Sequence, residues 1–293
     1  MANLMKSLFI LFQYLVPQHL LSRLTGKLAN AETPWLKNLL IRKFIRRYGV
    51  NMAEARDSTP EAYATFNDFF TRALQDNART IHPANDAIVC PADGVVSAAG
   101  NISADRIFQA KGKSFSLTAL LGGSEHIANP FQEGSFVTVY LSPKDYHRVH
   151  MPCAGKLKKM IYVPGKLFSV NQTTADNIDN LFARNERVVC LYDTDAGPMA
   201  LVLVGAMIVA GIETVWAGQV APARHGLSEE DYERHHPPLQ YGKGDEMGRF
   251  RLGSTVIVLF GHGAARWVDG LEENRSVQMG EAIGSINLPQ GAG

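Results

Sequence analysis

Four side chains in three short segments could together activate a hydroxyl group. Asp93 follows Pro-Ala and precedes Gly, His147 and His150 lie three residues apart, and Ser254 follows a glycine. An aspartate can orient a histidine, and the histidine can remove the proton of a serine hydroxyl, whatever their order in the chain. Each segment alone is weak evidence, because Asp-Gly turns and paired histidines are common. Together they predict a reactive serine at position 254.

The residues around Ser254 do not match the usual motif of a serine hydrolase. Hydrolases of the α/β type present the nucleophile in G-x-S-x-G, at a sharp turn from a strand into a helix. Ser254 instead follows Gly253 directly and opens the apolar run Thr255–Phe260, which predicts a strand. A conventional Asp-His-Ser hydrolase remains an alternative, and it predicts an intact chain with a free serine hydroxyl.

The same segments resemble a known family. Leu252–Thr255, with the sequence Leu-Gly-Ser-Thr, is similar to the cleavage signature of phosphatidylserine decarboxylase proenzymes, the bacterial, pyruvoyl-dependent enzymes of prokaryotic type I. The similarity runs from the N-terminal helices almost to the end of the chain, with no departure at the catalytic positions. It is weakest over Pro222–Gly244 and the last dozen residues. Other similar segments are Thr65–Arg72, Tyr162–Gly165, Asn180–Arg187, Glu213–Gly218 and Gly244–Gly248.

This resemblance implies that the chain cuts itself between Gly253 and Ser254. Ser254 would attack the Gly253 carbonyl, while His150 takes the serine proton and Asp93 orients that histidine, as a charge relay. Glycine favours the attack, because a residue without a Cβ tolerates strain and leaves its carbonyl open. The products would be a chain of residues 1–253 and a chain of residues 254–293, which remain associated through shared strands.

The resemblance also implies the cofactor and the reaction. Ser254 would become a pyruvoyl group, a covalent cofactor that forms a Schiff base with the serine headgroup of phosphatidylserine and accepts the electrons left by CO2. The product would be phosphatidylethanolamine. His147 is the candidate proton donor for the resulting carbanion, with a packing role as its alternative. The family further implies a dimer of cleaved protomers. No metal is expected, because the spacing of cysteines and histidines fits no ligand pattern.

Apolar stripes bordered by cations occupy the first 47 residues. The run Leu8–Val16 has about half the length that a spanning helix needs. Arg23 and Lys27 disfavour a signal peptide, and helices that pack inward are a further alternative. We expect peripheral binding to an anionic membrane surface, on the cytoplasmic side of the cell membrane. The stripes comprise Leu20, Leu21, Leu24, Leu28, Trp35, Leu36, Leu39, Leu40 and Phe44.

The whole sequence predicts an α+β fold. Residues 1–80 form a helical, membrane-associating region, in which residues 53–75 favour a helix with an aromatic core stripe. Residues 81–293 form a β-rich catalytic domain, because β-branched runs alternate with Gly and Pro. Pro222–Gly244 is polar and predicts a long loop. The clearest strand runs are Phe136–Leu141, Val188–Tyr192, Leu201–Val204 and Thr255–Phe260.

Charge and cysteine content exclude several classes of function. With 29 basic and 28 acidic residues the formal net charge is +1, which gives no case for nucleic-acid binding. The three cysteines, Cys90, Cys153 and Cys190, are widely spaced, which argues against disulfides and structural zinc and favours a reducing compartment. The histidines of the Pro222–Gly244 segment fit no metal-ligand spacing, and they are His225, His235 and His236.

Two further functions remain as alternatives. A soluble pyruvoyl-dependent decarboxylase of a free amino acid would share self-cleavage, but it would have no use for the N-terminal stripes. A non-catalytic lipid-binding module would bind liposomes and stay uncut. Membrane binding and chain cleavage therefore separate these alternatives from the phospholipid decarboxylase.

Overall fold

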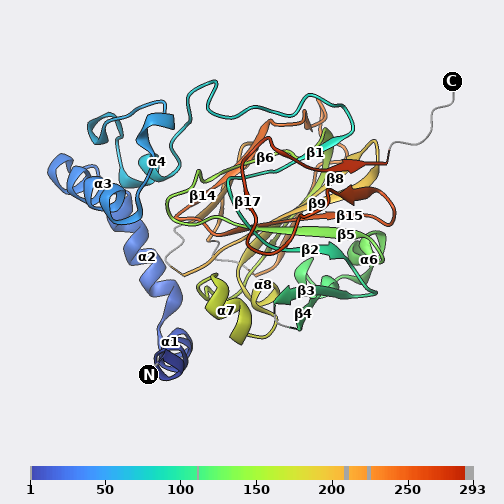
Figure 1. Cartoon of the computed structure of the whole chain (residues 1–293), viewed down its shortest axis with the longest axis horizontal. Coiled ribbons are helices and arrows are strands. Elements are labelled where there is room, and N and C mark those ends of the chain that lie inside the picture. Colours follow the sequence, from blue (N-terminus) through green and yellow to red (C-terminus); the bar gives the residue numbers. More distant parts are fainter. Residues whose placement is uncertain (1, 111, 208–210, 223–225, 288–293) are drawn as a thin grey trace.

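The computed structural model describes residues 2–110, 112–207, 211–222 and 226–287. Helices lie at the N-terminal end, and strands are the most frequent elements of the remaining chain, as Figure 1 shows. This arrangement confirms the predicted α+β class. The helices are drawn to one side of the strands in Figure 1, so the N-terminal part forms a projecting arm.

Three helices make up most of this arm, and local signals set their ends. Pro17 separates the first two, Pro34 lies at the start of the third, and Gly49 ends the third in a left-handed conformation with φ 68°. Proline suits a first helical turn, and glycine adopts positive φ without steric cost. The helices are α1 (Ala2–Leu15), α2 (Gln18–Ala29) and α3 (Pro34–Tyr48).

The predicted helix over residues 53–75 is mostly wrong. Only α4 (Phe66–Phe70) is α-helical there, preceded by two 3-10 turns, η1 (Met52–Glu54) and η2 (Pro60–Ala62). Thr65 starts α4 through a capping box with the Asp68 side chain, which fixes a helix start that the aromatic pattern alone does not show. The aromatic stripe itself is buried as predicted, because Phe66, Phe69 and Phe70 pack against α3.

One large antiparallel sheet is the scaffold of the second part. Its central strand β15 (Thr255–Phe260) pairs with β5 on one side and β9 on the other, and all six of its residues are buried. All four predicted strand runs lie in this sheet. The strand order is β12 (Ser228–Asp231), β7 (Gly155–Val163), β8 (Arg187–Thr194), β9 (Gly197–Val204), β15, β5 (Ser135–Tyr140), β2 (Gly94–Asn101) and β17 (Ser276–Val277).

The two faces of this sheet bury separate apolar cores. Val256, Val258 and Phe260 of β15 point to one core, and Ile257 and Leu259 point to the other, as the two-residue period of a strand requires. The second core also contains residues of four short helices. These are α5 (Leu117–Leu120), α6 (Glu125–Ala128), which is followed by η3 (Asn129–Phe131), α7 (Gln172–Asn177) and α8 (Leu181–Arg184).

Three smaller sheets complete the fold. A four-stranded sheet packs residues of β6 and β14 into the first core. Its strands are β11 (Gly218–Ala221), β10 (Gly211–Thr214), β14 (Glu246–Arg251) and β6 (Arg148–His150). The others are β1 (Ala87–Val89), β18 (Ala282–Ile286) and β16 (Ala265–Trp267), and the hairpin of β3 (Arg106–Ala110) and β4 (Lys113–Ser116).

The segment Pro222–Gly244 is more ordered than the predicted loop. It contributes β12 and the short strand β13 (Gln240–Tyr241), and both pair with β7 at the sheet edge. Its polar composition reflects an exposed edge, where Glu229 pairs with Lys159 at 2.8 Å. The predicted solvated histidine His225 lies outside the described residues.

The chain changes sheets at the residues singled out by the sequence. β14 ends at Arg251 in the four-stranded sheet, and β15 begins at Thr255 in the large sheet. Residues 252–254 are therefore a short link whose two ends are held by different sheets. This link contains the predicted cleavage site.

Candidate active site at the link between two sheets

The link residues have unusual conformation and burial. Leu252 has φ 67°, in the left-handed region of backbone conformation that residues other than glycine rarely adopt. Ser254 is 1% exposed, and its carbonyl accepts a hydrogen bond of 2.8 Å from the Leu141 amide. Its Oγ lies 3.3 Å from the Thr255 hydroxyl. Ser254 is thus fixed at the head of the central strand, directly after the link's two other residues.

Gly253 lies against the ring of His147. A Cβ placed on Gly253 would come within 2.1 Å of His147 Nδ1, a separation that no side chain tolerates. Two contacts hold His147 there: its carbonyl accepts a 3.0 Å hydrogen bond from the Phe250 amide, and its ring stacks on Phe70 with centroids 4.0 Å apart. The glycine before Ser254 is therefore required by the packing of the folded site.

His147 is held in its neutral form. Burial, together with the Arg72 cation, lowers its pKa to about 3, against the opposing effect of the Ser142 and Pro143 backbone. The two backbone groups favour the protonated ring electrostatically. Neither nitrogen of the His147 ring, however, has a partner that meets hydrogen-bond geometry. A neutral imidazole without a partner can exchange a proton with whatever reacts beside it.

His150 is buried farther along the same segment. Its Nδ1 lies 2.7 Å from the Gly244 carbonyl, and its Nε2 lies 3.0 Å from the Tyr146 hydroxyl. Burial lowers the pKa of His150, with smaller effects from the Gly244 carbonyl and the charges around it. In the pairing of β6 with β14, the backbone of His150 lies opposite Glu246 at the start of β14. Ser254 comes after the other end of that strand.

Asp93 is bound by groups other than a histidine. Its Oδ1 accepts hydrogen bonds of 2.9 Å from Arg79 Nε and from the Met279 amide. Arg79 also donates to Glu54 at 2.8 Å. Among the described hydrogen bonds, none joins Asp93, His150 and Ser254 to one another. The structure therefore brings His147 to Gly253, while Asp93 and His150 lie in neighbouring networks.

A cavity of about 230 Å³ opens beside the link. Much of its wall comes from segments that the sequence did not assign to the site, including α3 and the stretch after β7. Its lining residues are Phe44, Tyr48, Phe70, Tyr140, Leu141, Pro143, His147, Ser169, Val170, Asn171, Ala206, Met207, Leu252, Gly253 and Ser254. We call this the reaction pocket.

Two buried glutamines of the N-terminal arm hold one wall of the reaction pocket. The side chain of Gln13 accepts a 2.9 Å hydrogen bond from the Ser169 amide, and that of Gln18 accepts one of 2.7 Å from the Leu167 amide. Both glutamines are almost completely buried. The sequence did carry a signal for these contacts, because Gln13 and Gln18 are amides within otherwise apolar segments near Pro17. A buried amide needs hydrogen-bond partners.

The described residues contain no group of three or more histidine, cysteine or acidic side chains placed to hold a metal ion. The three cysteines are free and buried. Burial raises the pKa of the Cys153 thiol to about 12, so this thiol is not a nucleophile at neutral pH.

Comparison with known proteins decides the family. A family model described as phosphatidylserine decarboxylase matches residues 66–285, which include the link and every candidate catalytic residue. The chain belongs to the phosphatidylserine decarboxylase family. A second family model, described as PSD, matches residues 8–49, the region of α1–α3.

Relatives over nearly the full length carry the same family name. The chain is 58% identical to a phosphatidylserine decarboxylase proenzyme of Marinobacter nauticus, over 97% of this chain and 100% of the relative. It is 57% identical to a proenzyme of that name from Azotobacter vinelandii, over 96% and 99%. A third, from Pseudomonas aeruginosa, is 58% identical over 94% and 96%. Among the described residues, no helix combines the length and apolar character needed to cross a bilayer.

Proposed function

We propose that this chain cuts itself at Gly253–Ser254 and then decarboxylates phosphatidylserine to phosphatidylethanolamine at a pyruvoyl group derived from Ser254. The observation that carries the proposal is the packing of a neutral histidine, His147, against the glycine that precedes a buried serine at the wall of a pocket. The relatives are named proenzymes, a word for chains that mature by cleavage.

Self-cleavage begins with attack of Ser254 Oγ on the Gly253 carbonyl carbon. The amide nitrogen leaves with a proton, so the peptide bond becomes an ester. β-Elimination then releases Gly253 as a carboxylate and leaves dehydroalanine, to which water adds with loss of ammonia to give the ketone. Leu252 supports the first step, because its left-handed backbone stores about 1–3 kcal/mol next to the scissile bond.

We assign His150 as the base for this attack and Asp93 as the group that supports its positive charge. Burial keeps His150 neutral, so it can accept a proton. The Asp93 charge acts on His150 in the direction that favours the protonated ring. In the uncut chain His150 is held by Tyr146 and Gly244, so the relay requires the ring to leave one of these partners.

Position 254 suits the electron sink that decarboxylation needs. A pyruvoyl group supplies a ketone conjugated with an amide carbonyl, which accepts the electron pair left by CO2. The backbone carbonyl of residue 254 is fixed by the Leu141 amide, and the next six residues are paired on both sides. The His147 ring lines the same pocket, against Gly253, and we assign it the return of a proton to the substrate carbon.

The N-terminal arm supports a substrate that stays in a membrane. Large apolar side chains are exposed on all three helices, among them Leu15 at 73% and Trp35 at 69%. Cations of α2 and α3 lie beside them, and each adds about 1 kcal/mol on an anionic surface. We therefore assign residues 1–80 to peripheral binding at the cytoplasmic face of the cell membrane and residues 81–293 to catalysis.

The two cleavage products would remain one folded unit. Residues 254–293 contain β15 at the centre of the large sheet, β17 at its edge, and β16 and β18 in the three-stranded sheet. Strands with partners on both sides cannot leave without breaking the core. We further propose that cleaved protomers form a dimer, as the family resemblance implies.

Intact mass and lipid turnover test the proposal together. The purified protein should consist of two chains divided after Gly253, with the smaller one blocked at its N-terminus, and it should convert phosphatidylserine in detergent micelles to phosphatidylethanolamine and CO2. Ser254→Ala should leave one uncut, inactive chain. A continuous wild-type chain with a free serine, the result expected for a hydrolase, would overturn the proposal.

A further inference from the structure

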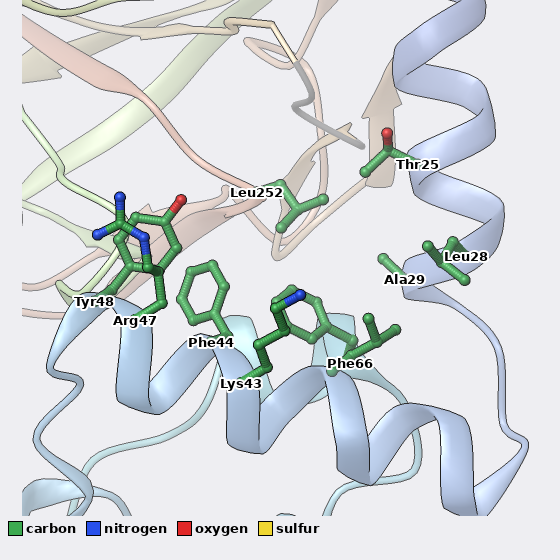
Figure 2. Close-up of a pocket in the computed structure, with 10 residues that line it drawn as sticks. Thr25, Leu28, Ala29, Lys43, Phe44, Arg47, Tyr48, Phe66 and Leu252 are labelled. Atoms are coloured by element: carbon green, nitrogen blue, oxygen red, sulfur yellow. The ribbon is translucent and has the colours of Figure 1, made fainter.

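A second cavity lies between the N-terminal arm and the link. It is an apolar groove of about 380 Å³, bounded by α2, α3 and α4. Figure 2 shows Leu252 approaching it from the side of the catalytic domain, with Phe44 and Phe66 on the opposite side. The lining residues are Thr25, Leu28, Ala29, Leu40, Lys43, Phe44, Arg47, Tyr48, Phe66 and Leu252. We call this the helix groove.

The helix groove and the reaction pocket share three lining residues, Phe44, Tyr48 and Leu252. Phe44 and Tyr48 belong to α3 and remain part of a helix when the chain is cut. Leu252 belongs to the link and is joined to the residue whose peptide bond breaks. Leu252 therefore lies where the two cavities meet. Of the three shared residues, it is the one next to the bond that self-cleavage breaks.

We propose that Leu252 is a plug: self-cleavage withdraws it and joins the helix groove to the reaction pocket, forming one site for an acyl chain and headgroup of a phospholipid. This inference rests on the proposed function and adds a reason why the uncut chain does not bind its substrate productively. Maturation then creates two things at once, the ketone and the passage to it.

Two forces move Leu252 after the cut. Its left-handed conformation is maintained while β14 holds one end of the link and β15 holds the other. Cleavage turns Leu252 and Gly253 into a free tail after β14, which can relax. It also creates a carboxylate on Gly253, next to the buried His147 ring and aromatic side chains. An ionised carboxylate without a buried partner is driven toward water.

The groove fits an acyl chain with a phosphate near its mouth. Its lining is predominantly apolar, and the exposed cations Lys43 and Arg47 lie one helical turn apart on α3. Neither forms an ion pair within the part of the chain that the structure describes, while neighbouring Arg42 is paired with Glu61. Two unpaired cations beside an apolar groove match a phosphodiester joined to a hydrocarbon chain.

Binding of dioctanoyl phosphatidylglycerol below its micelle concentration tests the plug. This lipid has the phosphodiester and the chains but no amine, so it cannot react with a ketone. Cut wild-type protein should bind it about tenfold more tightly than uncut Ser254→Ala, a difference of about 1.4 kcal/mol. Adding Leu252→Ala to Ser254→Ala should recover most of that affinity. Leu24→Ala, at an exposed leucine of α2, is the matched control and should recover none.

Filling the helix groove tests its occupant. Thr25→Trp in the cut enzyme should lower kcat/KM about tenfold for dioctanoyl phosphatidylserine and far less for the dibutyryl substrate, whereas Leu24→Trp, at an exposed leucine of α2 that does not line the groove, should lower neither. Equal lipid affinity of cut and uncut protein, with normal turnover of phosphatidylserine, would overturn the plug alone. An unselective effect of Thr25→Trp would remove the acyl chain from the groove. A wild-type chain that stays uncut would overturn the proposed function as well.

Discussion

The ring of His147 occupies the space that a side chain on Gly253 would need, with Nδ1 only 2.1 Å from the position of an added Cβ. This contact ties the residue before the scissile bond to a histidine that the sequence places 106 positions earlier. A larger residue at position 253 would have to displace this ring. The requirement for glycine at the cleavage site is therefore a property of the folded pocket.

Gly253→Ala should stop self-cleavage and destabilise the protein. The added methyl group overpacks a buried site, which typically costs about 1–3 kcal/mol. Intact mass reports the cleavage, and urea unfolding reports the stability. The double variant Gly253→Ala/His147→Ala removes the clash and should regain most of the lost stability; if it is as unstable as the single variant, the ring contact is not the cause.

Variants of His147 and His150 should separate self-cleavage from decarboxylation. His147→Ala is expected to yield cut protein whose turnover of phosphatidylserine falls about 10²–10⁴-fold, because proton transfer is lost at the second stage. His150→Ala and Asp93→Asn should instead slow the cut itself, followed by mass over time after synthesis. An uncut His147→Ala chain would show that His147, whose ring lies against Gly253, is the base for self-cleavage.

Acid should weaken the fold through His147. Its folded-state pKa of about 3 lies below the ordinary value of 6.5, so the unfolded chain binds a proton more readily. The resulting stability is fully present above pH 6.5 and is lost progressively as the pH falls toward 3. Unfolding in urea at pH 7 and pH 5 should show a smaller pH effect for uncut Ser254→Ala/His147→Phe than for Ser254→Ala.

Gln18 should matter to substrate binding without touching the substrate. Gln18→Ala leaves the buried Leu167 amide without its partner, which costs about 1–3 kcal/mol and loosens the stretch that carries Ser169. We expect a higher KM for phosphatidylserine with self-cleavage retained. His19→Ala removes an exposed contact to the neighbouring Gly165 carbonyl and is the control. Equal KM values for the two variants would contradict this role.

Negative charge at the exposed leucines of α1 should weaken binding of the protein to membranes. Leu11 and Leu15 are exposed at 53% and 73%, and replacing both by glutamate places anions against an anionic lipid surface. Sedimentation with phosphatidylglycerol vesicles should fall, while self-cleavage continues. This pair is a sharper test than deletion of residues 1–30, because deletion also removes Gln13 and Gln18. Unchanged sedimentation would place membrane contact elsewhere.

The strands were accessible from sequence because their signals are local. Thr255–Phe260 is apolar on both faces, and it is the central strand with both faces buried. The helix predicted over residues 53–75 was wrong because Phe66, Phe69 and Phe70 mark a core stripe but not its length. That length is set by the Thr65 cap and by the turn at Pro60.

The arrangement around the site depends on contacts between distant residues, which one sequence does not reveal. Arg79 was not predicted, yet it holds Asp93 through its guanidinium. The positive φ of Leu252 was equally hidden, because leucine carries no signal for that conformation. The relay of Asp93, His150 and Ser254 stays a prediction, since the uncut chain assigns the first two to other partners.

Because β15 lies between β5 and β9, the large sheet must fold before the chain is cut. The sheet must assemble while its middle strand is still tethered to everything before it. Once the tether is severed, a denatured sample is a mixture of one long and one short polypeptide that must find each other again by diffusion. Heat inactivation of the matured protein should therefore be irreversible, whereas the uncut Ser254→Ala chain refolds on its own.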